Sequence, residues 1–512
     1  MLRKLAAVLI VSLATLVVAC GGGTTTTTTT AATDPNGTLN FGFSTDASSN
    51  YDPQAATNQF VNTYLYPVYD RLINFTPDGK FEPMLADSWT FQDAGKSLVM
   101  KLHKGVVFHD GAAFDAAAVV ANIDRAKNYA KSTVKVDLAS VDSATAVDQY
   151  TVKLNLNGPS GSLPALLADR AGMMISPNAL KNTDLDLKPV GSGPYKADVA
   201  PGKTITYTKF DKYWNPSKQL VGKIVISIII DSNARVTALR DGTLDAASLT
   251  PDLLDQVGQA KNLSVQADTT LQTYNMYLNL SRPGLNNVAV RQALSYAIDR
   301  ATIAKTLHAG YCTPVAQIFP TGYWANDPKT AATAYGYDVT KAKALLATAG
   351  LANGFSFTTS VIAVPFYSTQ AEAIQAQLAK VGVTMKVQAL APALLLASFQ
   401  TTKTADAYYS LWPGAVDPAK TVASLYQPKS LFNPGGYTDD KVVSEAAAGL
   451  GGTDQASRAP HYQAISKEIS DQVLSIPICS AKSLSGVDQR VRNLKVNPAG
   501  AYDLTYAQVV KS

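Results

Sequence analysis

Residues 223–246 read KIVISIIIDSNARVTALRDGTLDA and contain the elements that determine the fold class. Lys223–Ile230 is a β-branched run without alternation, as expected for a strand that is covered on both faces. Ala234–Arg240 has the composition of a short helix, and Leu244–Ala246 is a second short strand. A strand, a helix and a strand at this spacing predict a parallel α/β unit.

Upstream of this unit the pattern favours short strands and hairpins. Thr38–Ser44 alternates into a strand, and Trp89–Leu102 alternates like the two strands of a hairpin. Asn62–Ile73 and Phe114–Lys127 are predicted helices, and Thr151–Leu156 is a further strand. The early part of the chain is therefore expected to differ in architecture from the parallel unit that follows.

Downstream of the unit, helices with one apolar face alternate with strands. Val290–Ile298 places its apolar side chains on one helical face, and Asp338 can cap a helix that Gly350 closes. Ala371–Lys380 is a further helix, and Val383–Val387 returns as a strand. These units predict a second α/β lobe, since a chain of 512 residues exceeds one ordinary hydrophobic core.

The N-terminus of the chain reads as a secretory signal. Arg3 and Lys4 precede the apolar run Leu5–Ala19, which is shorter than the roughly 20 residues that a membrane-spanning helix needs. The run leads into Val-Val-Ala-Cys-Gly at 17–21, which resembles the lipobox of bacterial lipoproteins. This resemblance implies cleavage before Cys20 and a diacylglyceryl group on its sulfur. An ordinary signal peptide and an uncleaved anchor are the alternatives.

A flexible tether is expected after Cys20. Gly21–Asn36 contains the uninterrupted Thr24–Thr30 run and has no apolar side chain large enough to build a core. A diacyl group would hold such a tether firmly, because each buried methylene contributes about 0.8 kcal/mol. We therefore expect an exported lipoprotein, anchored at the outer face of the cell membrane or in a periplasm.

Charge and cysteine content narrow the possible functions. The chain has 44 basic and 39 acidic residues, and loss of Arg3 and Lys4 with the signal leaves a net charge of +3. This charge is too small to indicate nucleic-acid binding. Beside Cys20 the chain has Cys312 and Cys479, which form either one disulfide or two buried thiols in an oxidising compartment.

A series of short motifs follows in a fixed order along the folded part of the chain. They are Leu85–Trp89 and Lys104–Gly111, Val190–Tyr195 with Tyr213-Trp214, Val290–Arg300, Tyr337-Asp338 with Ala342–Gly350, Trp412 with Asp417-Pro418, and Ile476-Pro477. Together they resemble the family 5 extracytoplasmic solute-binding proteins, the peptide- and nickel-type binding components of ATP-driven importers. The resemblance extends from about residue 39 to the C-terminus.

The resemblance implies a two-lobed α/β fold of the periplasmic-binding-protein type II, which closes on its ligand like a clamshell. It also implies an extra subdomain inserted in the first lobe. The expected parts are a signal peptide at residues 1–19, a lipidated tether at 20–38, lobe I at 39–51, 189–272 and 480–512, the inserted subdomain at 52–188, and lobe II at 273–479.

The implied role is capture of a peptide-like or similarly sized organic solute and its delivery to a permease driven by ATPases. The protein is expected to act as a monomer, without a cofactor and without a nucleic-acid partner. An oligosaccharide and a metal chelate are alternative ligands. A receptor that presents bound solute to a signalling partner is a further alternative.

The loop from Trp412 to Pro418 departs from the family pattern. In the family, a tryptophan-containing loop lines the ligand cleft, and many peptide binders place an aspartate there for the amino group of the ligand. At the expected position, two or three residues after Trp412, this chain has Gly414 or Ala415. Asp417 before Pro418 is also a good helix start, and we favour a capping role for it over ligand contact.

Aromatic residues supply the other candidates for ligand contact. Tyr408, Tyr409 and Trp412 lie close together in sequence. Tyr274 and Asn275 lie on a segment that resembles a crossing between lobes. A mostly apolar, aromatic-lined cleft with few polar groups is the usual small-ligand site. We therefore predict that these five residues, together with Asp417, bind the solute.

Enzyme and metal interpretations fit the sequence poorly. His109 and Asp110 are adjacent, so on a strand they would point to opposite faces and could not share an ion. Gly158–Ser162 fails the Gly-x-Ser-x-Gly pattern at its last residue, and the four histidines are scattered. We assign no catalytic residue and no metal ligand. A hydrolase acting on cell-wall peptides or glycans is the rival class of function.

Overall fold

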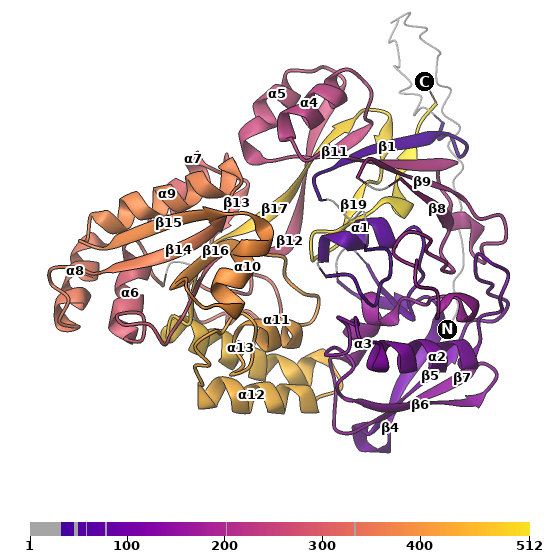
Figure 1. Ribbon diagram of the computed structural model, residues 1–512, viewed down its shortest axis with the longest axis horizontal. Coiled ribbons are helices and arrows are strands. Elements are labelled where there is room, and N and C mark those ends of the chain that lie inside the picture. Colours follow the sequence, from indigo (N-terminus) through magenta and orange to yellow (C-terminus); the bar gives the residue numbers. More distant parts are fainter. Residues whose placement is uncertain are drawn as a thin grey trace, which may run out of the picture. The chain divides into compact units, whose positions relative to one another are not determined.

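A mixed sheet connects most of the protein in the computed structural model, which describes residues 32–45, 50–57, 59–76, 79–200, 202–331 and 334–511 (Figure 1). Within these residues the sheet has 11 strands, in the order β15-β14-β16-β12-β17-β11-β1-β10-β9-β8, and β13 pairs with β17. The predicted signal peptide, Cys20 and most of the predicted tether lie outside the described residues. No described helix is both long and apolar enough to cross a membrane.

Lobe I contains one end of this sheet and the C-terminal segment. Its elements are β1 (Thr38–Phe43), α1 (Asn62–Leu65), β8 (Tyr195–Ala200), β9 (Thr204–Lys209), β10 (Lys223–Ile228), α4 (Ser232–Arg240), β11 (Ala246–Ser248), α5 (Leu254–Gly258), β18 (Val491–Arg492), β19 (Lys495–Val496), β20 (Tyr502–Asp503) and β21 (Gln508–Val509). Strand β1 pairs in parallel with both β10 and β11, and α4 lies between them in sequence. The predicted parallel α/β unit is confirmed.

The inserted subdomain has a hydrophobic core of its own, built between Leu72 and Met174. Its elements are β2 (Ile73–Phe75), β3 (Phe81–Pro83), β4 (Ala86–Gln92), β5 (Ser97–Leu102), α2 (Ala116–Asn128), β6 (Val141–Asp148), β7 (Thr151–Leu156) and α3 (Leu163–Leu167). Four antiparallel strands, in the order β4-β5-β7-β6, form its main sheet. This core falls inside the predicted range 52–188, whereas residues from Ala56 to Tyr69 near the start of that range, and from Ile175 to Leu185 near its end, pack in the core of lobe I.

Lobe II packs helices against the other end of the large sheet, around a core that extends from Tyr274 to Ala481. Its elements are α6 (Val288–Tyr296), α7 (Arg300–Thr306), β13 (Cys312–Pro314), α8 (Val339–Thr348), β14 (Ser356–Ile362), α9 (Pro365–Ala379), β15 (Thr384–Leu390), α10 (Pro392–Leu396), β16 (Ala407–Trp412), α11 (Pro418–Leu425), α12 (Asp440–Gly451) and α13 (Gln455–Asp471). Asp338 caps α8 through its carboxylate and the amide of Lys341, as predicted.

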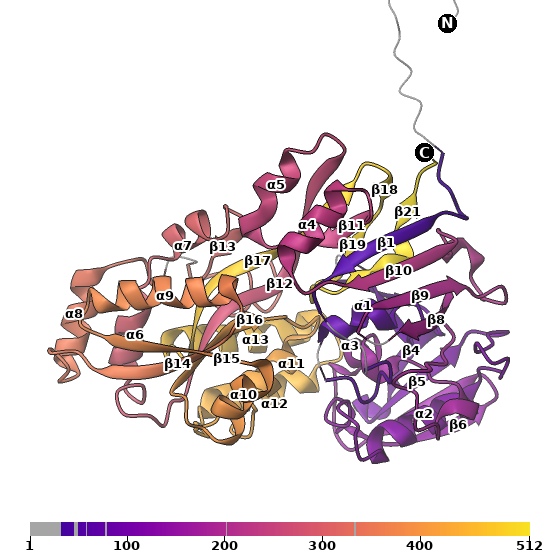
Figure 2. The same cartoon turned by 45° about the horizontal axis from the view of Figure 1, so that its top comes forward.

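Two long antiparallel strands join the lobes. β12 (Leu263–Leu278) and β17 (Ser475–Asp488) pair with each other over most of their length and contribute to the cores of both lobes. Helices α4 and α5 lie near β11 and the lobe I end of these strands in both views (Figure 1, Figure 2). Between Thr269 and Thr273 the register of β12 shifts against β17, so the ladder is interrupted where the chain passes between lobes.

Two local predictions were wrong. The predicted helix Asn62–Ile73 is a single turn at Asn62–Leu65, because Pro67 has no amide hydrogen to donate and its ring clashes with a continuing helix. The run Lys223–Ile230 is a strand as far as Ile228, but it is not covered on both faces. Its side chains alternate between buried and half-buried positions, and Ile230 is 69% exposed.

A buried carboxylate holds the Tyr213-Trp214 motif against the start of the subdomain. Asp70 is fully buried and accepts hydrogen bonds from the Tyr213 hydroxyl at 3.1 Å and from Trp214 Nε1 at 2.7 Å. Burial raises the pKa of Asp70 to about 7, although both hydrogen bonds act in the opposite direction.

The raised pKa of Asp70 predicts a pH-dependent free energy of unfolding. Between the unfolded pKa near 4 and about 7, the folded protein keeps a proton that the unfolded chain has released, so stability falls as pH rises through this window. Asp70→Asn should remove this contribution, of the order of 1 kcal/mol per pH unit. Urea unfolding of both proteins at several pH values measures it, and a difference between them that stays constant from pH 4 to 7 would refute the assignment.

Candidate ligand-binding site

The main cavity of the protein has a volume of about 1140 Å³ and is bounded by segments of both lobes and of the inserted subdomain. Its lining comes from Gly79–Phe81, Trp89, Gly161 and Pro164 in the subdomain, Asp268–Leu271 on β12, Pro320–Trp324, Val416, Asp417, Thr453–Gln455 and Arg458 in lobe II, and Lys495, Val496 and Pro498 in the C-terminal segment. The cavity is therefore formed jointly by both lobes and the subdomain.

The floor of the cavity is the interrupted part of β12. Thr270 and Leu271 lie in the register shift, where β12 has lost its regular pairing with β17. Their polar groups are satisfied locally instead. Leu271 donates its amide to the carbonyl of Pro498 at 2.7 Å, and the Thr270 hydroxyl donates to the carbonyl of Ala481 at 2.8 Å. These bonds fix the backbone between the lobes in a conformation that faces the cavity.

Aromatic side chains from two parts of the protein line the cavity. Phe81 and Trp89 come from the subdomain, and Tyr323 and Trp324 come from lobe II. The Tyr323 hydroxyl donates to the carbonyl of Val416 at 2.7 Å, and burial raises the pKa of Tyr323 well above its ordinary value, so it remains a donor. Aromatic walls of this kind are typical of sites for organic solutes.

A buried ion pair supports the lobe II wall. Both guanidinium ends of Arg458 donate to the carboxylate of Asp417, at 2.5 and 2.8 Å, and the guanidinium carbon lies 5.5 Å from the ring centre of Trp324. Arg458 also donates to the carbonyl of Gly161 in the subdomain at 3.1 Å. Because Arg458 neutralises Asp417, this carboxylate offers little free charge to a ligand.

Asp417 caps helix α11. Its Oδ1 accepts the amide hydrogen of Ala419 at 2.9 Å, and Pro418 occupies the first helical position. The capping role that the sequence favoured is therefore confirmed. Asp417 also lines the main cavity, so its contact with a solute remains a prediction.

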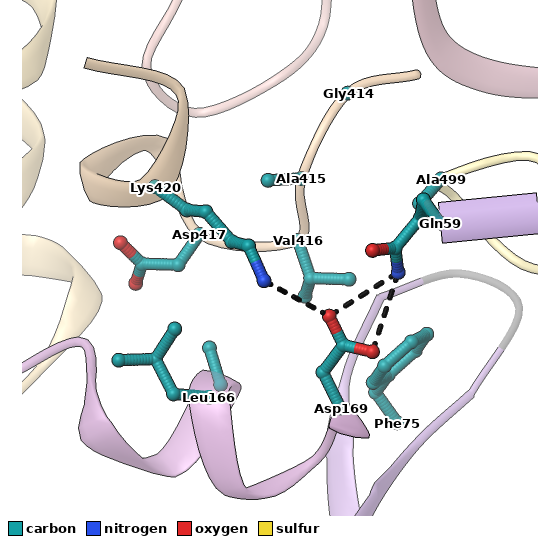
Figure 3. A pocket seen from close by; sticks show the side chains of 11 residues that line it. Gln59, Phe75, Leu166, Asp169, Gly414, Ala415, Val416, Asp417, Lys420 and Ala499 are labelled. Atoms are coloured by element: carbon teal, nitrogen blue, oxygen red, sulfur yellow. Dashed lines mark hydrogen bonds and ion pairs between the residues drawn. The ribbon is translucent and has the colours of Figure 1, made fainter. Parts of the chain in front are cut away.

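A small pocket, of about 20 Å³, adjoins the main cavity and shares Val416 and Asp417 with it (Figure 3). Lys420 of α11 points into this pocket towards Asp169 of the subdomain, which also accepts hydrogen bonds from Gln59. The remaining lining residues are Phe75, Ala165, Leu166, Gly414, Ala415 and Ala499. The pocket has room for about one water molecule.

The other five predicted ligand-binding residues lie in the core of lobe II. β16 pairs with β12, which brings Tyr408, Tyr409, Trp412, Tyr274 and Asn275 together as the sequence suggested. Tyr408 stacks on Tyr277, Tyr409 donates its hydroxyl to Gln370 at 2.7 Å, and Trp412 donates Nε1 to Thr421 at 3.2 Å. Their side chains are 0 to 9% exposed, and none lines either cavity described above. Their contact with a solute remains a prediction.

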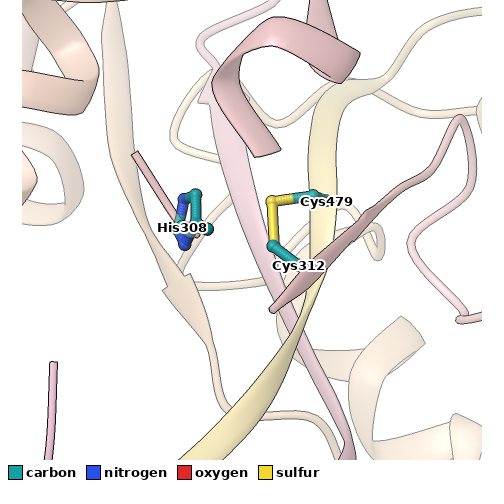
Figure 4. A group of neighbouring side chains, drawn as sticks. All are labelled: His308, Cys312 and Cys479. Atoms are coloured by element: carbon teal, nitrogen blue, oxygen red, sulfur yellow. A yellow bond between two sulfur atoms is a disulfide. The ribbon is translucent and has the colours of Figure 1, made fainter. Parts of the chain in front are cut away.

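Cys312 and Cys479 form a disulfide that joins β13 to β17, with their Cα atoms 5.6 Å apart (Figure 4). The imidazole of His308 lies nearby and pairs through Nε2 with the side-chain oxygen of Gln370 at 2.9 Å. Burial lowers the pKa of His308 to about 4, so this imidazole is neutral at physiological pH. Of the two alternatives that the sequence left open, the structure has the disulfide.

Several lining residues were missed by sequence reasoning. Tyr323 and Trp324 form an aromatic pair in a loop, which is a signal that could have been followed. Arg458 lies within a helix and carries no local signal of its role, and neither does Lys420. Among the described residues that line the main cavity there is no histidine, cysteine or serine. A hydrolytic nucleophile of the serine or cysteine type has no candidate in this lining.

Comparison with known proteins places the chain in a family. The model of the bacterial extracellular solute-binding proteins, family 5, matches residues 80–432. The glutathione-binding protein GsiB of Pectobacterium atrosepticum is 30% identical over 465 residues, which cover 87% of this chain and 89% of that protein. GsiB of Escherichia coli K12 is 29% identical over the same length.

Solved structures show the same fold. The periplasmic binding protein DppA of Helicobacter pylori, in complex with the peptide STSA, superposes with a TM-score of 0.82 and 25% identity, covering 93% of this chain and 98% of that one. NikA of Brucella suis, in complex with Fe(III)-EDTA, gives a TM-score of 0.83 at 24% identity, covering 93% and 100%. The two-lobed α/β fold expected from the sequence motifs is confirmed.

Proposed function

This chain belongs to the bacterial extracellular solute-binding proteins of family 5, and from that premise we propose that it captures an organic solute between its lobes and delivers it to an ATP-driven importer. The observation that supports this proposal most directly is the cavity of about 1140 Å³ that both lobes and the subdomain line together. A solute in this cavity would contact both lobes and the subdomain, so its binding energy would stabilise the closed arrangement that a permease can recognise.

We propose a peptide-like solute, or one of similar size, as the ligand. Curated relatives are named as glutathione-binding proteins, and one similar structure holds a tetrapeptide. The cavity supports this class through its aromatic walls and through charges of both signs at Asp268 and Lys495. A metal chelate is the alternative ligand, since the similar NikA structure holds Fe(III)-EDTA.

A thermal-shift screen of peptides, glutathione, oligosaccharides and metal chelates tests the proposal. A solute at 100 times its dissociation constant stabilises the protein by about 2.7 kcal/mol, because it binds the folded state and not the unfolded chain. We expect one of these classes of solute to raise the melting temperature by an amount that corresponds to this stabilisation. The absence of a shift with any class, together with an empty protein in native mass spectrometry, would count against the proposal.

Substitutions of two tryptophans distinguish the main cavity from the aromatic core of lobe II as the place where the solute binds. Trp324→Ala removes a cavity wall and should weaken binding roughly tenfold or more, whereas Trp412→Phe should change the dissociation constant by less than about threefold. Isothermal titration with the solute found in the screen measures both, and circular dichroism checks that each variant is folded. Stronger loss with Trp412→Phe would place the site in the aromatic cluster that the sequence suggested.

We propose that Cys20 carries the lipid anchor and that residues 21–36 tether the binding lobes to the membrane. The lipobox-like sequence at 17–21 supports this proposal. Cys20→Ser should move the protein from the membrane fraction to the soluble extracytoplasmic fraction, because it removes the sulfur that would be acylated. If the variant stays in the membrane fraction, another segment or partner holds it there.

The rival function is hydrolysis of cell-wall peptides or glycans. The relatives named above are binding proteins, and among the described residues no serine or cysteine lines the main cavity as a nucleophile for peptide hydrolysis. Incubation of the purified protein with a peptide library, followed by mass spectrometry, separates the two functions. Stoichiometric retention of intact peptide supports binding, and the appearance of products in excess of the protein would support the hydrolase.

A further inference from the structure

An ammonium group of the protein lies between two carboxylates at the contact between the lobe II helix α11 and the inserted subdomain. Lys420 Nζ is 3.1 Å from an oxygen of Asp137 and 3.3 Å from an oxygen of Asp169. Lys420 belongs to lobe II, and both aspartates belong to the subdomain. The three side chains are 24, 10 and 12% exposed, so this is a largely desolvated interaction and not a surface pair.

The charges of this cluster are balanced within the protein. Besides Lys420, Asp169 accepts hydrogen bonds from Gln59 at 3.2 Å and from Asn62 at 2.8 Å, and the cation Arg170 adjoins it. Burial on its own would raise the pKa of Asp169, but Lys420 and Arg170 outweigh it and hold this pKa below its ordinary value. Burial lowers the pKa of Lys420, but Asp137 and Asp169 outweigh this and raise it. Lys420 and Asp169 are therefore both ionised, and the ammonium between the two carboxylates belongs to the protein itself.

Part of the cluster borders a pocket next to the main cavity. Lys420 and Asp169 line the small pocket, which shares Val416 and Asp417 with the main cavity (Figure 3). With room for about one water beside the lysine, the pocket cannot accept a second ammonium group and its side chain.

We propose that the Lys420 ammonium is the protein's own occupant of an ammonium-binding subsite formed by Asp137 and Asp169. Without Lys420, the two carboxylates could bind a primary ammonium through charge-assisted hydrogen bonds, with Arg170 remaining beside Asp169. With Lys420 in place, a solute binds in the main cavity without placing its amino group there. The inference that a solute binds without an amino group in the subsite rests on the proposed function. It defines the class of solute as one that needs no free amino group beside Asp137 and Asp169.

The subsite itself is tested without a solute. In Lys420→Ala, the space of the lysine stem opens and the two carboxylates lose the ammonium that lies between them, so the melting temperature should fall. Ethylammonium should restore it, whereas tetramethylammonium at the same ionic strength should not, because it donates no N–H hydrogen bond. The wild type and Lys441→Ala, which breaks the pair between the half-exposed Lys441 and Glu468, should respond equally to both salts.

A second substitution tests whether the rescue by ethylammonium depends on the proposed carboxylates. Adding Asp169→Asn to Lys420→Ala should abolish the preference for ethylammonium. If Lys420→Ala does not fold by itself, the refolding yield in ethylammonium against tetramethylammonium gives the same comparison. Equal effects of the two salts on Lys420→Ala, in either measurement, would overturn the subsite.

Pairs of tripeptides with free and acetylated N-termini test the consequence for the solute. Acetylation should change the affinity of the wild type by less than about threefold, whereas Lys420→Ala should prefer the free amine roughly tenfold or more. A wild type that loses more than about tenfold on acetylation would overturn this consequence. If the wild type binds no peptide, the peptide part of the proposed function fails, and the ethylammonium measurement still decides the subsite.

Discussion

Arg458→Ala is expected to lower the free energy of unfolding by about 3 to 5 kcal/mol, the usual cost of leaving one partner of a buried ion pair uncompensated. Arg458 and Asp417 are each 5% exposed and joined by two hydrogen bonds. The variant also leaves the carbonyls of Gly449 and Gly161 without this donor. Urea unfolding monitored by circular dichroism measures the effect.

The matched control for this prediction is an ion pair at the surface of the same helix. Lys467 pairs with Asp471 one turn away, and both side chains are about half-exposed. Lys467→Ala should therefore cost no more than about 0.5 kcal/mol. A loss below about 1 kcal/mol for Arg458→Ala would show that the pair contributes little and that water or other groups compensate Asp417.

Removing the disulfide should have a similarly large effect. Cys312 and Cys479 are separated by 167 residues, and closing a loop of this length restricts the unfolded chain by roughly 5 kcal/mol in the chain-entropy model. The double variant Cys312→Ala, Cys479→Ala should lose about 2 to 5 kcal/mol. Urea unfolding of the wild type and the variant, each with and without a dithiol reductant, measures it.

The reductant serves as an internal control for this prediction. It should destabilise the wild type and leave the double variant unchanged, since the variant has no bond left to reduce. A thiol titration of the unfolded wild type confirms that reduction has taken place. If the unfolding midpoint of the wild type stays the same after both thiols have become titratable, the disulfide does not stabilise the fold.

Most of the architecture follows from local patterns. The β-branched run at residue 223, the helix after Asp231 and the short strand at Ala246 form the predicted parallel unit because strands joined by a helix pair in this way. Asp338 and Asp417 cap helices as expected, because an aspartate before a helix satisfies free backbone amides. The helix predicted at residue 62 was wrong, because Pro67 ends it after one turn although the apolar pattern continues.

The binding site was less predictable from sequence. Tyr408 and Tyr409 are adjacent on β16 and so point to opposite faces of the sheet, and both are buried. An aromatic residue on a central strand that is covered on both faces has the same sequence signal as one that lines a cleft. The proximity of these residues could be anticipated, but their exposure to a ligand could not.

The contacts between lobes depend on residues that are far apart in the chain. Lys420 is 251 positions from Asp169 and 283 from Asp137, and Arg458 reaches Gly161 over 297. No local periodicity or spacing in the sequence connects such pairs, so these contacts can be identified only in the tertiary structure. The departure at Gly414 and Ala415 was visible in the sequence, and the structure shows what lies beside it, a lysine held by two aspartates.

Native mass spectrometry tests the central proposal, capture of one solute between the lobes, most directly. The protein and its Trp324→Ala variant are incubated with a small-molecule extract of growth medium, desalted and compared. We predict a one-to-one adduct of a small organic solute on the wild type, and its loss or strong reduction in the variant. An unliganded wild type, or an adduct retained equally by both proteins, would contradict capture in this cavity.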